Sequence, residues 1–412
     1  MGGVMSPVLR RLLLNPDSGE YGPFRNIVPL TLANPITDLT RAAGLQGDGL
    51  PLGSGMGIWA AATNLCTNGG FETNTTGWTA GGTNTLAASA AQAKFGTKSG
   101  LATYADNATL ADYAATITNA AHTASVWVYI PANYDGGGIE LRQLNYTVAA
   151  SATAANMALT DQWQRLTLTF TPGADVIGNL QVNNTGAAPT ATRFVYIDGV
   201  QIETGSVAMP YIETDGGTAA RSAARVQCPV SGLFTASQGG VFTRWRMGWS
   251  SASLPSADTR WWWWGVNDAR ICMSPTATAA QLISDTGPNV TVDQAGTWAR
   301  DELIGIFGKW SNSSVDITKN VAAFTSAARA AVPTISQTKC DVGYRSDTNA
   351  GEVSSTAVWQ AYFSLPPSNA DSAALHSMGN APNYHCLSRI ANCTGVIDFR
   401  EAIPVLRKRV GV

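Results

Sequence analysis

The chain has 412 residues, of which only 13% are charged, and its formal net charge at pH 7 is −2. At roughly 150 residues per domain, this length favours two or three domains over one. Such a weak charge produces no broad field that would attract nucleic acid or an anionic membrane, so we expect neither partner. No apolar run approaches a membrane span, and the start of the chain has no signal-peptide core, so we expect no membrane insertion.

The first segment, residues 1–62, is rich in Leu, Pro and Gly and lacks a periodic core of its own. Its apolar stretches need a cover; they are LRRLLLNP and NIVPLTLANPITDL. We therefore predict that residues 1–62 form an anchoring segment that docks on another protein or on symmetry mates. The chain is accordingly expected to be a homo-oligomer, with a trimer as the first expectation.

From Asn64 onward, short stretches with β-forming residues alternate with turn residues. Regularly spaced short strands are typical of sandwiches and jelly rolls, so we predict a first jelly roll over residues 63–214. A run of Gly and other small residues, PYIETDGGTAARSAARV, marks the boundary that follows it.

A second set of strands predicts another β-sandwich over residues 215–376. It ends in a short predicted helix, PSNADSAALHSMG, for which Ser368 is a suitable N-cap. Residues 377–412 then form a C-terminal extension with a basic tail. The fold class expected for the chain is all-β, with two tandem β-sandwich domains.

Four consecutive tryptophans, Trp261–Trp264, stand in the second set of strands. Successive side chains of a strand point to opposite faces, so two rings point each way. One pair fills the core, and the other is outward unless something covers it. We favour burial of that pair in a contact between domains or subunits. The alternative is a platform for a sugar, for which we take Trp262 and Trp264 as candidates.

In the first predicted domain, the stretch SVWVYI places Trp127 and Tyr129 on one face of a strand. Aromatic rings on a sheet can stack on the apolar face of a sugar, so both are candidate glycan contacts. Core packing is the alternative, above all for Trp127. We interpret Trp163, in QWQRLTLTF, as a core residue.

Short motifs in the first domain follow the strand order of one known family: NLCTNGGFETNTTGWTA, KFGTKSGLATY, SVWVYI, WQRLTLTFT and FVYIDGVQIETG. They resemble the carbohydrate-binding jelly rolls of bacterial glycanases and of tailed-phage virion proteins. The junction VQIETGSVAMPYIETDGGTAARSAARV resembles the segment found at the end of such modules in phage tail and structural proteins. The second domain is similar to concanavalin A-like, laminin G-like jelly rolls through VFTRWRMGW, LIGIFGKWSNSSVDITKN and VWQAYFSLPPSNADSAAL.

The resemblance implies a tailed-bacteriophage virion protein, tail-associated and assembled in the host cytoplasm. In the carbohydrate-binding family, the glutamate of GFE and an aspartate on the last strand commonly hold calcium with backbone carbonyls. These positions correspond to Glu72 and Asp198, so the resemblance implies a structural calcium ion there. The alternative is that both are ordinary surface acids.

No catalytic constellation is visible in the sequence. The Glu-x-Asp-x-x-Glu strand of concanavalin-like glycanases has no match, and none of the three histidines stands in a nucleophile motif. We therefore expect a non-enzymatic virion component that binds host-surface glycans or reinforces the particle, in contact with other virion proteins. Two alternatives remain: a glycanase with a carbohydrate-binding module, and a decoration protein that binds only protein.

The six cysteines are scattered and include no Cys-x-x-Cys pair. A disulfide framework would be denser and in a smaller chain, and the spacing around Cys386 and Cys393 matches no usual zinc module. Buried free thiols are the interpretation that we favour.

Overall fold

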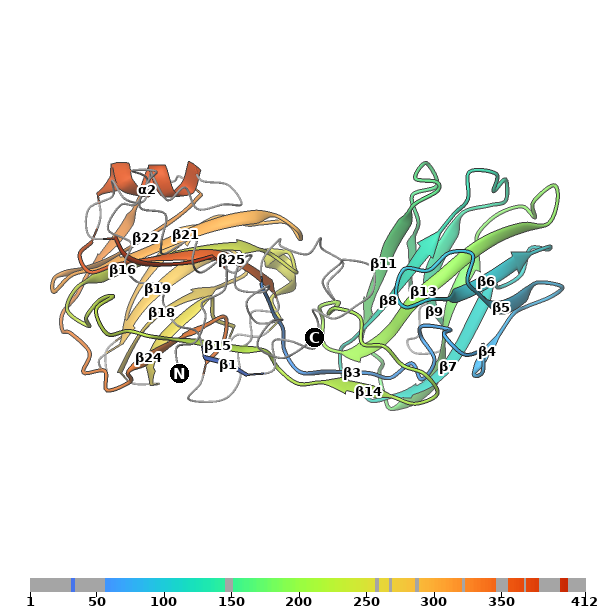
Figure 1. Ribbon diagram of the computed structural model, residues 1–412, viewed down its shortest axis with the longest axis horizontal. Coiled ribbons are helices and arrows are strands. Elements are labelled where there is room, and N and C mark those ends of the chain that lie inside the picture. Colours follow the sequence, from blue (N-terminus) through green and yellow to red (C-terminus); the bar gives the residue numbers. More distant parts are fainter. Residues whose placement is uncertain are drawn as a thin grey trace, which may run out of the picture. The chain divides into compact units, whose positions relative to one another are not determined.

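The structure is a computed structural model, and it describes residues 31–33, 56–144, 151–255, 259–266, 269–285, 289–320, 323–345, 355–366, 368–377 and 393–398. The regular structure of these residues consists almost entirely of strands (Figure 1), which confirms the predicted all-β class. The predicted anchoring segment and C-terminal extension lie almost wholly outside the described residues.

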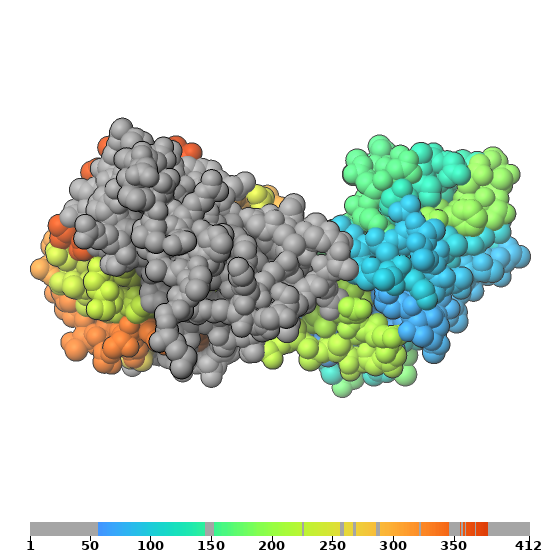
Figure 2. Space-filling view, viewed as in Figure 1, coloured from blue at the N-terminus to red at the C-terminus, as the bar shows by residue number. Residues whose placement is uncertain are grey.

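The described chain forms two compact units. We call residues 61–222 the first sandwich, and residues 31–33, 56–60 and 223–398 the second sandwich. Figure 2 shows the first sandwich as one surface coloured from blue to green, as expected for a continuous stretch of sequence. The domain limits drawn from the sequence, 63–214 and 215–376, stay predictions.

The first sandwich contains two five-stranded antiparallel sheets and a two-stranded sheet, in which β3 (Ala62–Asn64) pairs with β14 (Ala219–Arg221). The β8 sheet has the order β11-β8-β13-β6-β5, and the β12 sheet has the order β10-β9-β12-β7-β4. Their strands are β4 (Trp78–Thr79), β5 (Thr85–Ser89), β6 (Ser99–Tyr104), β7 (Ala111–Ile117), β8 (His122–Tyr129), β9 (Ile139–Leu144), β10 (Ser151–Ala154), β11 (Trp163–Phe170), β12 (Val176–Asn184) and β13 (Arg193–Thr204).

The core of the first sandwich lies between these sheets and follows the period-2 alternation of the sequence. On β8, Val126 and Val128 are completely buried, whereas Trp127 and Tyr129 are only half-buried on the other face. Val126 is in register with the buried Leu166 of β11. The sequence therefore sets which face of each strand is apolar.

The second sandwich consists of two larger antiparallel sheets. One has the order β1-β15-β24-β17-β18-β19-β20, and the other has the order β2-β25-β16-β21-β22-β23, with β26 also paired to β25. The strands are β1 (Thr31–Ala33), β2 (Met56–Ile58), β15 (Arg225–Pro229), β16 (Gly239–Arg246), β17 (Trp262–Val266), β18 (Ala269–Pro275), β19 (Ala279–Asp285), β20 (Asn289–Ala295), β21 (Leu303–Trp310), β22 (Ser314–Lys319), β23 (Thr325–Ala328), β24 (Lys339–Val342), β25 (Ser355–Phe363) and β26 (Cys393–Asp398).

The predicted short helix is present as α2, Asn369–Ser377, near β16, β21 and β22 (Figure 1). Ser368 Oγ accepts a hydrogen bond from Asp371 N at 3.2 Å, and Asp371 Oδ2 accepts one from Ser368 N at 3.0 Å. This reciprocal pair caps the helix as expected for Ser368. Within the described ranges, no helix is long and apolar enough to cross a membrane.

Candidate functional site

The inward pair of the tryptophan run fills the core of the second sandwich. Trp262 and Trp264 expose 0% and 5% of their surface. Trp262 stacks on Trp310 of the opposite sheet at a centroid distance of 5.8 Å, and Phe234 lies 5.5 Å from Trp262 and 5.1 Å from Trp264. Because the interior of the sandwich covers both rings, the suggestion that they contact a glycan does not fit the structure.

Trp261 and Trp263, the other pair of the run, are also completely buried within the second sandwich, where Trp261 lies 5.5 Å from the Trp298 ring. Trp263 faces outward. Three guanidinium groups lie over it, with carbon-to-centroid distances of 4.4 Å for Arg345, 5.2 Å for Arg270 and 5.6 Å for Arg260. Guanidinium groups are attracted to the electron-rich face of an indole. The favoured explanation, a contact between domains or subunits, is therefore not needed to bury Trp263.

Trp127 lies on the outward face of β8, and residues of its own sandwich contact it. Lys94 Nζ is 4.0 Å from the ring centroid, and the Phe95 ring packs edge to face at 6.2 Å. The side chain is half-buried rather than in the core. Since Lys94 occupies the region over the ring, Trp127 is a poorer stacking platform than its neighbours on the same sheet.

Tyr129 belongs to a row of three rings across the outward face of the β8 sheet. It is in register with Trp163 of β11 and Tyr196 of β13, at centroid distances of 5.6 and 5.8 Å. All three rings are partly exposed, and Phe194 beside them is 41% exposed. We call Trp163, Tyr129 and Tyr196 the aromatic row.

The interpretation of Trp163 as a core residue is wrong. Leu166 and Leu168 of the same strand point into the core, so Trp163 and Arg165 have the opposite parity and face outward. This alternation is visible in WQRLTLTF, and it is the sequence signal that identifies Trp163 as an outward residue. The sequence contains no comparable signal for the register that brings Tyr196 to Tyr129.

The outward face of the β12 sheet carries interlocked polar side chains that the sequence reasoning did not single out. Arg142 Nε donates to Gln181 Oε1 at 2.8 Å. Gln181 Nε2 and Asn179 Nδ2 donate to the two oxygens of Asp112 at 2.9 and 2.7 Å. We call Asp112, Arg142, Asn179 and Gln181 the polar network. The alternating polar residues of VIGNLQVNN are its one local signal.

The polar network continues at one end through Asn183, which donates to Glu140 Oε1 at 3.3 Å. Each amide is held by a partner on a neighbouring strand, which fixes the orientation of its donors and acceptors. Gln181 and Asn183 are themselves buried, so the partly exposed Asp112, Arg142 and Asn179 would offer their remaining lone pairs and N–H groups to a ligand without further ordering. Such an arrangement suits a ligand with many hydroxyl groups.

Asp198, one of the two predicted calcium ligands, is a buried carboxylate beside loop 94–98. Its Oδ2 accepts hydrogen bonds from Lys94 N at 2.7 Å and Phe95 N at 2.9 Å. Burial raises the pKa of Asp198 to about 7; these backbone hydrogen bonds oppose the shift, and the nearby charge of Glu72 adds to it.

Glu72 approaches the same loop from its other end. Its carboxylate accepts from Thr97 N at 3.0 Å, from Thr97 Oγ1 at 2.8 Å and from Lys98 N at 3.2 Å. Gly96, which precedes Thr97 in this loop, has φ +63°. A Cβ there would lie 2.1 Å from Glu72 Oε1, so this position needs glycine. The structure thus brings together the two carboxyl groups that the resemblance pairs.

Glu72 and Asp198 are a suitable donor set for a hard divalent cation, because carboxylate oxygens are ligands that such a cation prefers. Among the described residues, no group of three His, Cys, Asp or Glu side chains is placed to hold a metal ion. Backbone carbonyl oxygens would therefore supply the other ligands of a calcium ion between Glu72 and Asp198. This requirement fits calcium, which accepts carbonyl as well as carboxylate oxygen.

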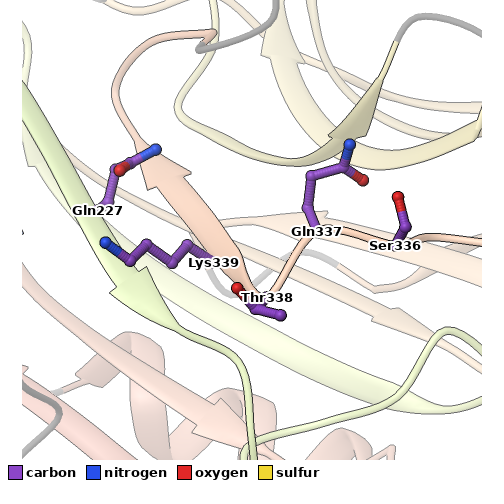
Figure 3. Close-up of a pocket in the computed structure, with 5 residues that line it drawn as sticks. All are labelled: Gln227, Ser336, Gln337, Thr338 and Lys339. Carbon is purple, nitrogen blue, oxygen red and sulfur yellow. The ribbon is translucent and has the colours of Figure 1, made fainter.

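A shallow cavity of 310 Å³ opens beside β15 and the start of β24 in the second sandwich (Figure 3). Its lining residues are Gln227, Ser336, Gln337, Thr338 and Lys339. No carboxyl group is among these five described residues, so glycoside hydrolysis, which needs two, has no candidate there.

No protein-family model matches the chain, and no curated protein matches it. Several solved β-sandwich structures are similar to it. The xylan-binding domain CBM22-1 of Paenibacillus barcinonensis Xyn10C is 18% identical, with a TM-score of 0.27, over 34% of this chain and 92% of that domain. The tandem CBM22-1–CBM22-2 domain of the same protein is 12% identical, with a TM-score of 0.29, over 74% of this chain and 96% of that one.

Domains LG4-5 of the mouse laminin α1 chain are 9% identical, with a TM-score of 0.24, over 83% of this chain and 94% of that one. These neighbours are carbohydrate-binding and laminin LG domains. At such identities and TM-scores the likeness carries no argument about what this chain binds.

Proposed function

We propose that the chain is a non-enzymatic, tail-associated virion protein of a bacteriophage whose first sandwich binds host-surface glycans through the polar network. The observation that carries the binding role is the set of hydrogen bonds that fixes Asp112, Gln181 and Arg142 on an outward sheet face. Virion origin is supported by the sequence resemblance of the junction between the two sandwiches.

A sugar ring presents hydroxyl groups that both donate and accept, and the polar network has matching groups of both kinds. Arg142 retains N–H groups, and each carboxylate oxygen of Asp112 has a second lone pair. The aromatic row is the second candidate surface, because its partly exposed rings are able to stack on the apolar face of a sugar. The two surfaces lie on different sheets of the first sandwich and are separable by mutation.

A structural calcium ion between Glu72 and Asp198 belongs to the same proposal. Both carboxylates bind the backbone of loop 94–98, so a cation there would hold this loop against β13. The proposed assembly is a homo-oligomer, with a trimer as the first expectation, bound to other virion proteins through residues 1–62. Several copies would raise the apparent affinity for a repeating glycan without new contacts.

The binding role is tested with the full chain on an array of bacterial wall and capsular polysaccharides. Gln181→Ala and Asp112→Ala are expected to weaken binding by about tenfold or more, since each leaves a partner unpaired. Ile177→Ala, at an exposed position of the same strand, is the matched control and should bind normally. Loss of binding with Trp163→Ala but not with Gln181→Ala would show that the glycan binds at the aromatic row and not at the polar network.

The alternatives have their own outcomes. A chain that binds no polysaccharide but still incorporates into particles would be a decoration protein that contacts only protein. Release of reducing sugar ends from these polysaccharides would favour the glycanase. Electron microscopy of purified particles with an antibody to residues 215–412 tests the virion role, and particles without label would contradict it.

A further inference from the structure

We propose that Cys228 and Cys340 form a disulfide bond that links β15 to β24 in the second sandwich. The two strands are antiparallel neighbours, and Cys228 lies directly opposite Cys340 in their register. The two Sγ atoms are 3.0 Å apart, and both side chains are completely buried. For these two cysteines the inference replaces the buried free thiols that the sequence favours, and it is independent of the proposed function.

The geometry requires little movement to close the bond. Opposed residues of antiparallel strands have Cα atoms about 4.5–5.5 Å apart, which lies within the range of about 4.4–6.8 Å found for disulfides. A disulfide bond is about 2.05 Å long, so the two sulfur atoms need to approach by only about 1 Å. Side-chain rotation alone supplies that approach.

The other described thiols are placed differently. Cys66 belongs to the core of the first sandwich, and Cys272 packs with Trp263 and Ile283 on the outward side of β18. Among the described cysteines, only Cys228 and Cys340 have their sulfur atoms in contact. Cys66 and Cys272 therefore serve as internal controls that should stay reduced.

The environment indicates when the bond forms. Burial and the neighbouring Cys228 raise the pKa of Cys340 well above its usual value, and thiolate is the reactive species. Reaction within the closed core is accordingly slow, so formation occurs while β15 and β24 pair during folding or when these two strands separate locally. Once formed, the bond is shielded from reductants by the same burial.

The oxidant is a small disulfide such as oxidised glutathione. One cysteine thiolate attacks it, which forms a mixed disulfide and releases one reduced thiol. The second cysteine thiolate then attacks the protein sulfur and displaces the other reduced thiol. In total the protein loses two protons and two electrons, and the oxidant leaves as two thiols.

Peptide mapping tests the bond directly. The full chain is refolded in oxidised and reduced glutathione, denatured, alkylated and digested with trypsin. The expected product joins peptide 226–244 to peptide 340–345, two hydrogen masses below their sum, whereas Cys66 and Cys272 are alkylated. Complete alkylation of both Cys228 and Cys340 would overturn the proposal.

Thermal unfolding provides a second readout. The bond would close a loop between residues separated by 112 positions, and long loops gain most from cross-linking. The oxidised chain should unfold on the order of 10 °C above the reduced chain. The double variant Cys228→Ala with Cys340→Ala should lose this difference, and Cys272→Ala should keep it. A difference that persists in the double variant would also overturn the proposal.

Discussion

The two sandwiches differ in whether their outward aromatic rings are covered. In the second sandwich, the outward Trp263 is buried beneath three guanidinium groups, and the inward Trp262 and Trp264 fill the core. In the first sandwich, the outward Trp163 and Tyr129 remain partly exposed. Both regions follow the same period-2 alternation. What covers the outward face, and not the number of rings in the sequence, therefore decides whether aromatic residues are available to a ligand.

The largest expected effect is on the stability of the second sandwich, in which the aromatic rings are covered. Trp262→Ala removes a completely buried ring that stacks on Trp310, so we expect a loss of about 3–5 kcal/mol in the free energy of unfolding. Trp163→Ala, the matched change in the aromatic row, should cost less than half as much. Denaturant unfolding of both variants, followed by circular dichroism, measures the difference. Equal losses would show that the aromatic row is as structural as the core.

The next prediction concerns the loop that covers Trp127. Loop 94–98 carries Lys94 over that ring and is held by Glu72 and Asp198. Calcium at a hundredfold excess over its Kd should therefore stabilise the first sandwich by about 2.7 kcal/mol, and Glu72→Gln should remove the effect. Thermal unfolding with calcium or with a chelator is the measurement. A melting temperature unaffected by calcium in the unmutated chain would contradict the proposed metal site.

Without calcium, the same loop should be sensitive to pH. The pKa of Asp198 is raised from 3.8 to about 7, so the folded chain retains a proton that the unfolded chain loses. This contribution to stability is fully present below about pH 4 and is lost as the pH rises through 7. Asp198→Asn should flatten the decline in melting temperature between pH 4 and pH 8, measured in chelator.

Glu203 provides a comparison for that experiment, because burial also raises its pKa to about 7. Glu203→Gln should also reduce the decline in melting temperature between pH 4 and pH 8, in addition to the effect of Asp198→Asn. It should leave the response to calcium unchanged. A pH profile that neither variant alters would show that other groups control the stability of the first sandwich.

The sequence predicts well what depends on neighbouring residues. Alternation predicts the strand faces of β8, on which Trp127 and Tyr129 share the outward side. It predicts poorly what depends on register between distant strands. Gln181 and Asp112 are 69 positions apart, and Cys228 and Cys340 are 112 apart, so only the folded sheet shows that they meet.

The smallest expected effect concerns the positively charged groups that lie over the indoles of Trp127 and Trp263. Lys94 Nζ lies 4.0 Å from the centroid of Trp127, whereas three guanidinium groups surround Trp263. A cation over a partly exposed indole contributes about 0.5–1 kcal/mol, so Lys94→Met should destabilise the first sandwich by no more than that. Because methionine retains much of the apolar stem, the loss measures the charge rather than the packing.

The same variant tests whether Lys94 keeps ligands away from Trp127. If it does, Lys94→Met should leave binding through the polar network unchanged and should make Trp127 fluorescence more sensitive to quenching by acrylamide. Trp127→Phe identifies the share of the signal that comes from this ring. Unchanged quenching in Lys94→Met would mean that Phe95 and the rest of loop 94–98 shield the indole, and that the cation contributes only its electrostatic attraction.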